Sequence, residues 1–217
     1  MSVTLVTGPV RSGKSRHAEN LLRHHLEVTY VATGRPADPV HAAVATDATD
    51  AADATDAADA EWAQRVRLHQ SRRAAGWLTI ETHEVEAAIR GATTPVLVDC
   101  LGTWLTAVVD TVGWGDLAAA ERVLTVRVAS LIAALLDSRV PVVVVSNEVG
   151  WSLVPVTPAG RFFQDQLGLL NAAVSAVAQQ VHLVVAGRVL DLSAAALVSL
   201  AAISPPSPAL PRASYDA

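Results

Sequence analysis

The 217-residue chain is poor in several residue types, and each shortage excludes a class of protein. Its single cysteine, Cys100, rules out an internal disulfide and is typical of the reducing cytoplasm. No apolar run approaches the roughly 18 residues needed to cross a bilayer, and the N-terminus lacks the features of a signal peptide. We therefore expect a cytoplasmic protein with no membrane span.

Positive charge is also scarce, and no basic patch is large enough to predict nucleic-acid binding. The net charge of −5 comes from an acidic, low-complexity insertion at about 37–60, which has no Lys or Arg. This insertion contains six aspartates: Asp38, Asp47, Asp50, Asp53, Asp56 and Asp59. From Asp47 on they recur every third residue, which gives a helix no apolar face, so we expect an exposed insertion or a marginal helix.

Lysine is the rarest cation, since Lys14 stands alone against 15 arginines. It belongs to a G-x-x-x-x-G-K-[S/T] pattern that follows an apolar run, as a phosphate-binding loop requires. In such a loop backbone N–H groups face an anion, the lysine reaches the β- and γ-phosphates, and the following serine binds Mg²⁺. The alternative is a plain glycine-rich turn. The predicted nucleotide-binding residues are Gly8, Pro9, Val10, Arg11, Ser12, Gly13, Lys14 and Ser15.

Strand and helix patterns alternate along the chain. We expect strands at 3–6, 28–32, 78–81, 96–100, 140–146 and 181–186, and helices at 12–25, 61–73, 85–90, 117–136 and 158–180. Continuous apolar strands are typical of a parallel sheet buried on both faces. The predicted class is therefore α/β, a doubly wound, P-loop NTPase-like, mostly parallel sheet with helices on both faces. We expect one domain over 1–190 and a loose C-terminal tail over 191–217.

Polar residues at strand ends are the next candidates, because ligands of such sheets bind at the carboxyl edge. Asp99 ends an apolar strand, where its carboxylate suits Mg²⁺, although a capping or salt-bridged aspartate is the alternative. The polar cluster at 146–150 follows another strand and suits either substrate contact or turn capping.

His69 lies among Arg65, Arg67, Arg72 and Arg73. Neighbouring guanidinium groups lower the pKa of a histidine, which keeps its imidazole neutral and nucleophilic, and they also bind phosphates. Composition alone favours a surface histidine instead.

Several motifs together resemble one family, the bifunctional adenosylcobinamide kinase/adenosylcobinamide-phosphate guanylyltransferases. The matching segments, in chain order, are the phosphate loop with residues 16–19, then 30–34, 65–77 around His69, 98–101, 146–150, and 160–165 through 171. The resemblance implies a mostly parallel sheet, a homotrimer, GTP as the nucleotide with ATP possible for the kinase step, and Mg²⁺. It also implies that adenosylcobinamide and its phosphate are the substrates and that His69 becomes covalently guanylylated.

The same resemblance implies further nucleotide contacts, namely Ala32, Thr33, Gly34, Gln70, Ser71, Arg72, Arg73, Glu81 and Asp99. Whether Glu81 or Asp99 serves the base, the ribose or the metal stays open. The chain departs from the family in having Leu68 where a second histidine is frequent, Ala74 where proline is usual, and the acidic insertion. Two rival functions remain, a single-activity P-loop small-molecule kinase and a regulatory protein that binds GTP without turnover.

Overall fold

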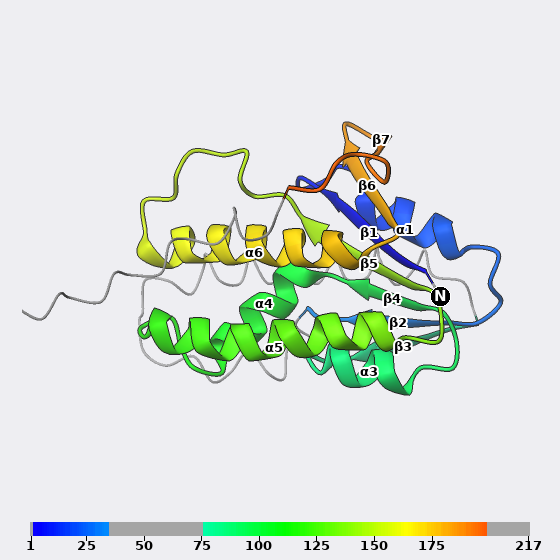
Figure 1. Ribbon diagram of the computed structural model, residues 1–217, viewed down its shortest axis with the longest axis horizontal. Coiled ribbons are helices and arrows are strands. Elements are labelled where there is room, and N and C mark those ends of the chain that lie inside the picture. The colour runs from blue at the N-terminus through cyan, green and yellow to red at the C-terminus, as the bar shows by residue number, and fades with distance from the viewer. Residues whose placement is uncertain (1, 35–75, 199–217) are drawn as a thin grey trace, which may run out of the picture.

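The computed structural model describes residues 2–34 and 76–198, which form an α/β structure (Figure 1). The strands are β1 (Val3–Gly8), β2 (Val28–Ala32), β3 (Trp77–Glu81), β4 (Val96–Asp99), β5 (Val142–Asn147), β6 (Gln180–Val185) and β7 (Arg188–Asp191). The helices are α1 (Lys14–Leu22), α3 (Val85–Gly91), α4 (Leu101–Asp110), α5 (Leu117–Asp137) and α6 (Pro158–Val177).

The strands form a single seven-stranded sheet in the order β3-β2-β4-β5-β1-β6-β7. All neighbours pair in parallel except β7, which is antiparallel to β6. The central strands β1, β4 and β5 are buried along almost their whole length because both faces of the sheet are covered. The predicted fold class is therefore confirmed.

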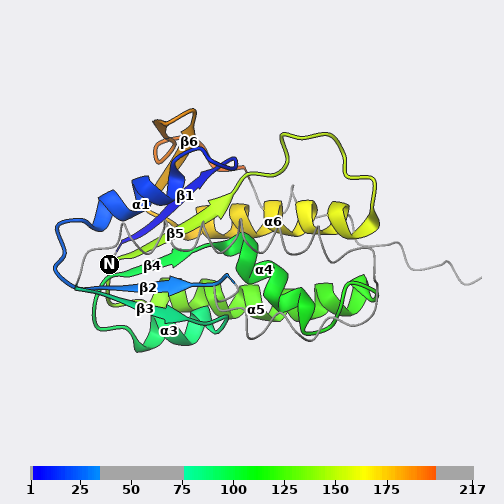
Figure 2. The same ribbon diagram turned by 180° about the vertical axis from the view of Figure 1, so that it is seen from behind.

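Alternate residues of the central strands pack on opposite faces of the sheet. One face packs against α1, with Val6, Leu97 and Val145 beneath Ala18 and Leu22. The other face is covered by α3, α4, α5 and α6, which lie together on that side (Figures 1 and 2).

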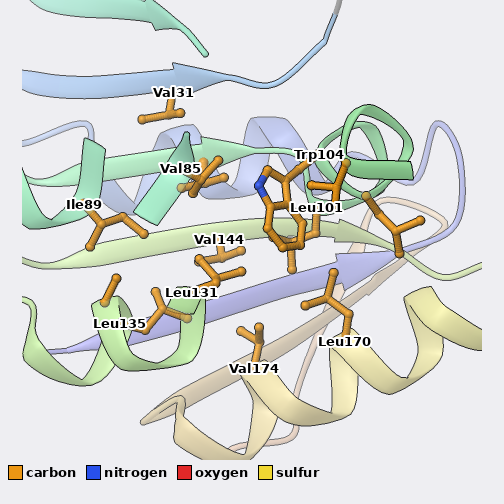
Figure 3. Packing of buried hydrophobic residues seen from close by; sticks show 14 of the residues in the cluster. Val31, Val85, Ile89, Leu101, Trp104, Leu131, Leu135, Val144, Leu170 and Val174 are labelled. Carbon is orange, nitrogen blue, oxygen red and sulfur yellow. The ribbon is translucent and has the colours of Figure 1, made fainter. Parts of the chain in front are cut away.

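Trp104 of α4 is fully buried in the larger of these two cores. In Figure 3 it lies close to Leu101 and Val85. Its indole nitrogen donates to the His83 carbonyl oxygen at 3.0 Å, which satisfies the one polar atom of a buried indole. Burial of this large side chain positions the start of α4 next to the carboxyl end of β4.

The sequence patterns missed two elements, α4 and β7. Helix α4 begins immediately after β4 and is capped by Cys100 and Thr103, not by the usual Ser, Thr, Asp or Asn at the N-cap. Strand β7 has four residues and returns from β6 through a tight turn with positive φ at Ala186 and Gly187. When an apolar segment is short and has no standard capping residue, its local sequence pattern does not show whether it forms a helix or a strand.

Element ends also differ from the prediction. Strand β1 continues to Gly8, and α1 begins at Lys14 because the chain bends through positive φ at Arg11 and Gly13. β4 stops at Asp99, β5 begins at Val142, and α6 ends at Val177. The helix expected at 61–73 and the acidic insertion lie outside the described residues.

Candidate active site

The phosphate loop joins β1 to α1, as the motif requires. A Cβ added at Gly8 would lie 2.2 Å from the Val184 carbonyl oxygen and 2.9 Å from Ser12 Oγ, so only glycine fits. The Ser12 N–H donates to the Pro9 carbonyl at 3.2 Å, and the Gly187 N–H donates to the Ser12 carbonyl at 3.1 Å. The loop is therefore closed on itself and held against the β6–β7 turn.

Lys14 is buried at the floor of this loop, with 9% of its surface exposed. Its ammonium donates to the Pro9 carbonyl at 3.2 Å. Burial lowers the Lys14 pKa, and nearby Cys100 and Asp99 offset part of that shift. Burial raises the pKa of the Cys100 thiol, so the thiol is neutral at neutral pH and contributes little to that offset, which comes mainly from the nearby Asp99 carboxylate. A buried cation so placed favours an anionic ligand.

The Ser12 hydroxyl gives independent support for an anion site. Its Oγ is buried and has no hydrogen-bond partner among the residues that the structure describes. A phosphate oxygen would supply the missing acceptor, since a buried hydroxyl without a partner is unfavourable. The lysine and this hydroxyl therefore both fit a bound phosphate.

Asp99 ends β4, on the same sheet edge as the phosphate loop. The Tyr30 hydroxyl, from the neighbouring β2, donates to Asp99 Oδ2 at 2.7 Å. Tyr30 is 2% exposed, so packing fixes the direction of this hydrogen bond. The structure thus brings Asp99 near Lys14 and shows how its carboxylate is oriented.

Residues 32–34 lie at the end of β2, at the same edge, but the Thr33 side chain makes its hydrogen bonds within the fold. Thr33 Oγ1 accepts from the Cys100 N–H at 2.8 Å and lies 2.6 Å from Thr103 Oγ1. With 1% exposure it is closed to solvent and ties β2 to the start of α4. Contact between this segment and a nucleotide would have to come from Ala32, Gly34 or the backbone.

Glu81 lies at the other end of the carboxyl edge. It ends β3, pairs in register with Ala32, and is exposed. Strands β2, β4 and β5 separate β3 from β1, which at about 4.8 Å per strand places Glu81 roughly 19 Å from β1. Asp99 is therefore the carboxylate at the phosphate end, and Glu81 is the distant one.

The side chains of the cluster at 146–150 make hydrogen bonds within the fold, to α6 and to the end of β1. Ser146 is fully buried and donates to Asn171 Oδ1 of α6. Glu148 is half-buried, its N–H donates to the Gly8 carbonyl at 3.0 Å, and its Oε1 accepts from Thr7 at 3.1 Å and Asn171 at 3.2 Å. The network holds the end of β5 against the phosphate loop. The pairing with Thr7 was not expected, because no local pattern links positions so far apart.

His17 lies one turn after Lys14 on α1. Its Nε2 is 2.9 Å from Nδ1 of His182 on β6. Burial and the His182 ring lower the His17 pKa, so the neutral form is favoured. This pair joins α1 to β6.

His69 and its neighbours Gln70, Ser71, Arg72 and Arg73 lie outside the described residues. Their expected roles remain predictions.

A glycine-rich loop between strand and helix, a buried lysine and a carboxylate on the same sheet edge define a P-loop nucleotide-binding protein. Comparison with known families then identifies the group to which it belongs. Residues 4–192 match the family model described as cobinamide kinase/cobinamide phosphate guanyltransferase. The chain belongs to this family, and it is a bifunctional kinase and guanylyltransferase of adenosylcobalamin biosynthesis.

Individual relatives agree with this assignment. The bifunctional adenosylcobalamin biosynthesis proteins CobU of Salmonella typhimurium and of Escherichia coli are each 34% identical to the chain over 194 residues, covering 84% of it and 95% of the relative. CobP of Pseudomonas aeruginosa is 30% identical over 193 residues, covering 87% of the chain and 95% of the relative.

Among the described residues, no helix has the length and apolar character needed to cross a membrane.

Proposed function

We propose that the chain phosphorylates the aminopropanol hydroxyl of adenosylcobinamide and then transfers GMP from GTP to the new phosphate through His69. The observation that carries the first step is the buried Lys14 beside Asp99, within a chain that matches the family over 4–192. The second step rests on the family resemblance around His69.

In the kinase step, the substrate hydroxyl oxygen attacks the γ-phosphorus of GTP or ATP. The bond from that phosphorus to the β–γ bridging oxygen breaks, the nucleoside diphosphate leaves, and the hydroxyl proton is released. The N–H groups of the loop and the Lys14 ammonium stabilise the phosphate charge. The Ser12 hydroxyl donates to a phosphate oxygen and so gains the acceptor that it lacks.

Mg²⁺ fits the donor atoms at this end of the site. Within residues 2–34 and 76–198, no three His, Cys, Asp or Glu side chains gather as a metal cluster. Mg²⁺ suits such a site because it prefers one or two protein oxygens together with phosphate oxygens and water. The Ser15 hydroxyl and the Asp99 carboxylate would hold it, and it would neutralise charge on the transferred phosphate.

In the guanylyl step, a nitrogen of His69 attacks the α-phosphorus of GTP and pyrophosphate leaves. The P–N bond then breaks when an oxygen of adenosylcobinamide phosphate attacks the same phosphorus, which gives adenosylcobinamide-GDP. Residues 70–73 contact the GTP phosphates during this exchange. A neutral imidazole among arginines is suited to both steps.

The two carboxylates, Asp99 and Glu81, have different roles because they lie at different positions on the sheet edge. Asp99 serves the phosphate end because it lies near Lys14. Glu81 lies at the end of the edge strand β3 and serves the base of the nucleotide. A carboxylate there accepts hydrogen bonds from the paired N–H donors of guanine, and adenine has no such pair. The proposal also includes a homotrimer in the cytoplasm, which the family resemblance and the single cysteine support.

Replacing His69 by asparagine tests the carrier role. We expect His69→Asn to form no covalent GMP adduct and no adenosylcobinamide-GDP, whereas formation of adenosylcobinamide phosphate largely persists, because asparagine has no nucleophilic nitrogen. The measurement is incubation with α-labelled GTP, detection of an acid-labile, alkali-stable protein adduct, and separation of the two corrinoid products.

The matched control is His83→Asn, which changes an exposed histidine and should leave the adduct intact. Continued GDP-product formation by His69→Asn contradicts the carrier role. Absence of any adduct in the unaltered chain, with kinase turnover present, would instead support a single-activity kinase.

A further inference from the structure

The segment between β5 and α6, residues 149–157, exposes several large apolar side chains to solvent. Trp151 is 61% exposed, Leu153 93%, Val154 75% and Val156 93%. No residue from 149 to 157 carries a charge. Exposed apolar side chains that gather in this way mark a binding surface more often than isolated ones do.

This segment, which we call the β5–α6 ledge, starts beside the phosphate loop. The N–H of Glu148, the residue just before it, donates to the Gly8 carbonyl. Trp151 follows three residues later and so lies within about 11 Å of Glu148, the most that three extended residues span. From there the ledge arches beside the N-terminal half of α6 and joins the start of that helix, on the side of the sheet where the strands end (Figures 1 and 2).

Hydrogen bonds from α6 hold the ledge in this shape. The Gln164 amide donates to the Val149 carbonyl at 3.0 Å. The Arg161 guanidinium donates to the carbonyls of Pro155 and Val156, each at 2.9 Å. Gly160 lets the helix approach closely, because an added Cβ there would lie 2.8 Å from Pro155 Cβ. The ledge is therefore pre-organised with its apolar side chains outward, which lowers the entropy cost of binding.

The reaction itself limits where the substrate can lie. The hydroxyl that is phosphorylated lies on a short side chain of the corrin macrocycle. The macrocycle must therefore bind the protein no farther from the phosphate loop than the length of that side chain. A corrin ring is large, rigid and rich in methyl groups, and its primary amides are uncharged. An uncharged surface with a flat indole at its near end matches this chemistry.

We propose that the β5–α6 ledge binds the corrin macrocycle of the substrate, with Trp151 as the contact nearest the phosphate loop. The inference rests on the proposed function, since it assigns the part of the substrate that the nucleotide residues do not hold. The alternative occupant is a second copy of the chain. Continuity with Glu148 and the phosphate loop favours the substrate.

The test uses the full chain with Trp151→Ala and Leu153→Ala. We expect each substitution to weaken adenosylcobinamide binding, by about tenfold or more for Trp151→Ala, since burying such a side chain is worth at least 1.4 kcal/mol, or about tenfold. The affinity for GTP and the yield of the GMP adduct should not change. Calorimetry gives both affinities, and kinase assays should show a raised KM for the corrinoid with kcat nearly retained.

Leu136→Ala is the matched control, because Leu136 is 64% exposed on α5 and should leave corrinoid binding unchanged. Trp151→Phe, which keeps an aromatic ring, should weaken binding less than Trp151→Ala and guards against loss of the fold. Light scattering on every variant reports the oligomeric state.

Unchanged corrinoid affinity in both ledge variants overturns the inference. A change in oligomeric state with unchanged corrinoid affinity also overturns it and assigns the ledge to a second copy. If the unaltered chain neither binds nor phosphorylates adenosylcobinamide, the proposed function fails together with the inference. An active chain with insensitive ledge variants contradicts the inference alone.

Discussion

Lys14 shows how one residue carries both function and an energetic penalty. The side chain is buried beneath the phosphate loop, where loss of hydration lowers its pKa. Because the folded pKa is below the unfolded one, the unfolded chain holds this proton more tightly, and the ammonium reduces stability at neutral pH. That penalty fades as the pH rises from the folded pKa to the unfolded one. A bound phosphate would offset it by adding negative charge next to the ammonium.

Lys14→Met separates the charge from the packing, because methionine keeps an unbranched apolar chain of similar length. We expect the variant to lose measurable GTP binding in calorimetry. Without nucleotide, its thermal midpoint at pH 7 should equal or exceed that of the unaltered chain, and any difference should shrink at alkaline pH. Normal GTP affinity, or a clearly lower midpoint without nucleotide, contradicts this account of Lys14.

Among the elements, the start of α3 is joined to α5 through Arg127. Arg127 of α5 reaches Glu86 of α3 at 2.6 Å and Glu84 at 3.1 Å, and it donates to the His83 carbonyl at 2.8 Å. Its guanidinium also lies 5.9 Å from the centre of the Trp104 ring. Glu86 is only 5% exposed, and its carboxylate forms an ion pair with Arg127. The contact therefore fixes the start of α3 over the larger core.

Arg127→Ala should destabilise the fold by about 3 kcal/mol, because it leaves Glu86 as a buried carboxylate without its partner. Urea unfolding measures the change. Arg122→Ala, an exposed arginine on the same helix, is the control and should stay within about 0.5 kcal/mol. The double variant Arg127→Ala/Glu86→Ala should cost less than the sum of the single changes. Strict additivity would show that the pair does not act as a unit.

At the scale of the whole molecule, the site is one edge of one sheet. The ends of β1, β5, β4, β2 and β3 follow one another along that edge. This order spreads the candidate residues from Gly8 at one end to Glu81 at the other, a span suited to an extended nucleotide. The ledge projects from the same edge, so the corrinoid and the nucleotide would meet at the phosphate loop.

The proposed homotrimer is a prediction about the assembled molecule. Light scattering of the purified chain should give three times the 22.6 kDa chain mass, and the value should not change within the working concentration range. Leu136→Ala, which changes an exposed side chain near the C-terminal end of α5, is the control and should assemble identically. A monomeric mass with full activity in both reactions contradicts the proposal.

The sequence by itself determined the features that depend on near neighbours along the chain. The spacing from Gly8 to Ser15 specifies the phosphate loop, and apolar runs such as 142–145 specify buried parallel strands. These signals are local, because a loop conformation or a strand's burial depends on residues within a few positions. The resemblance to the family likewise rested on short motifs in a fixed order, and it was confirmed.

Only the tertiary structure decided which of these segments meet. Tyr30 and Asp99 are 69 positions apart, and their hydrogen bond exists because β2 and β4 are neighbours in the sheet. The same strand order places Asp99, and not Glu81, near Lys14. Helix α4 and strand β7 have weak local signals. Burial of Trp104 in the core holds α4, and pairing with β6 holds β7. Strand order reflects the packing of whole elements, which no periodicity in one short segment encodes.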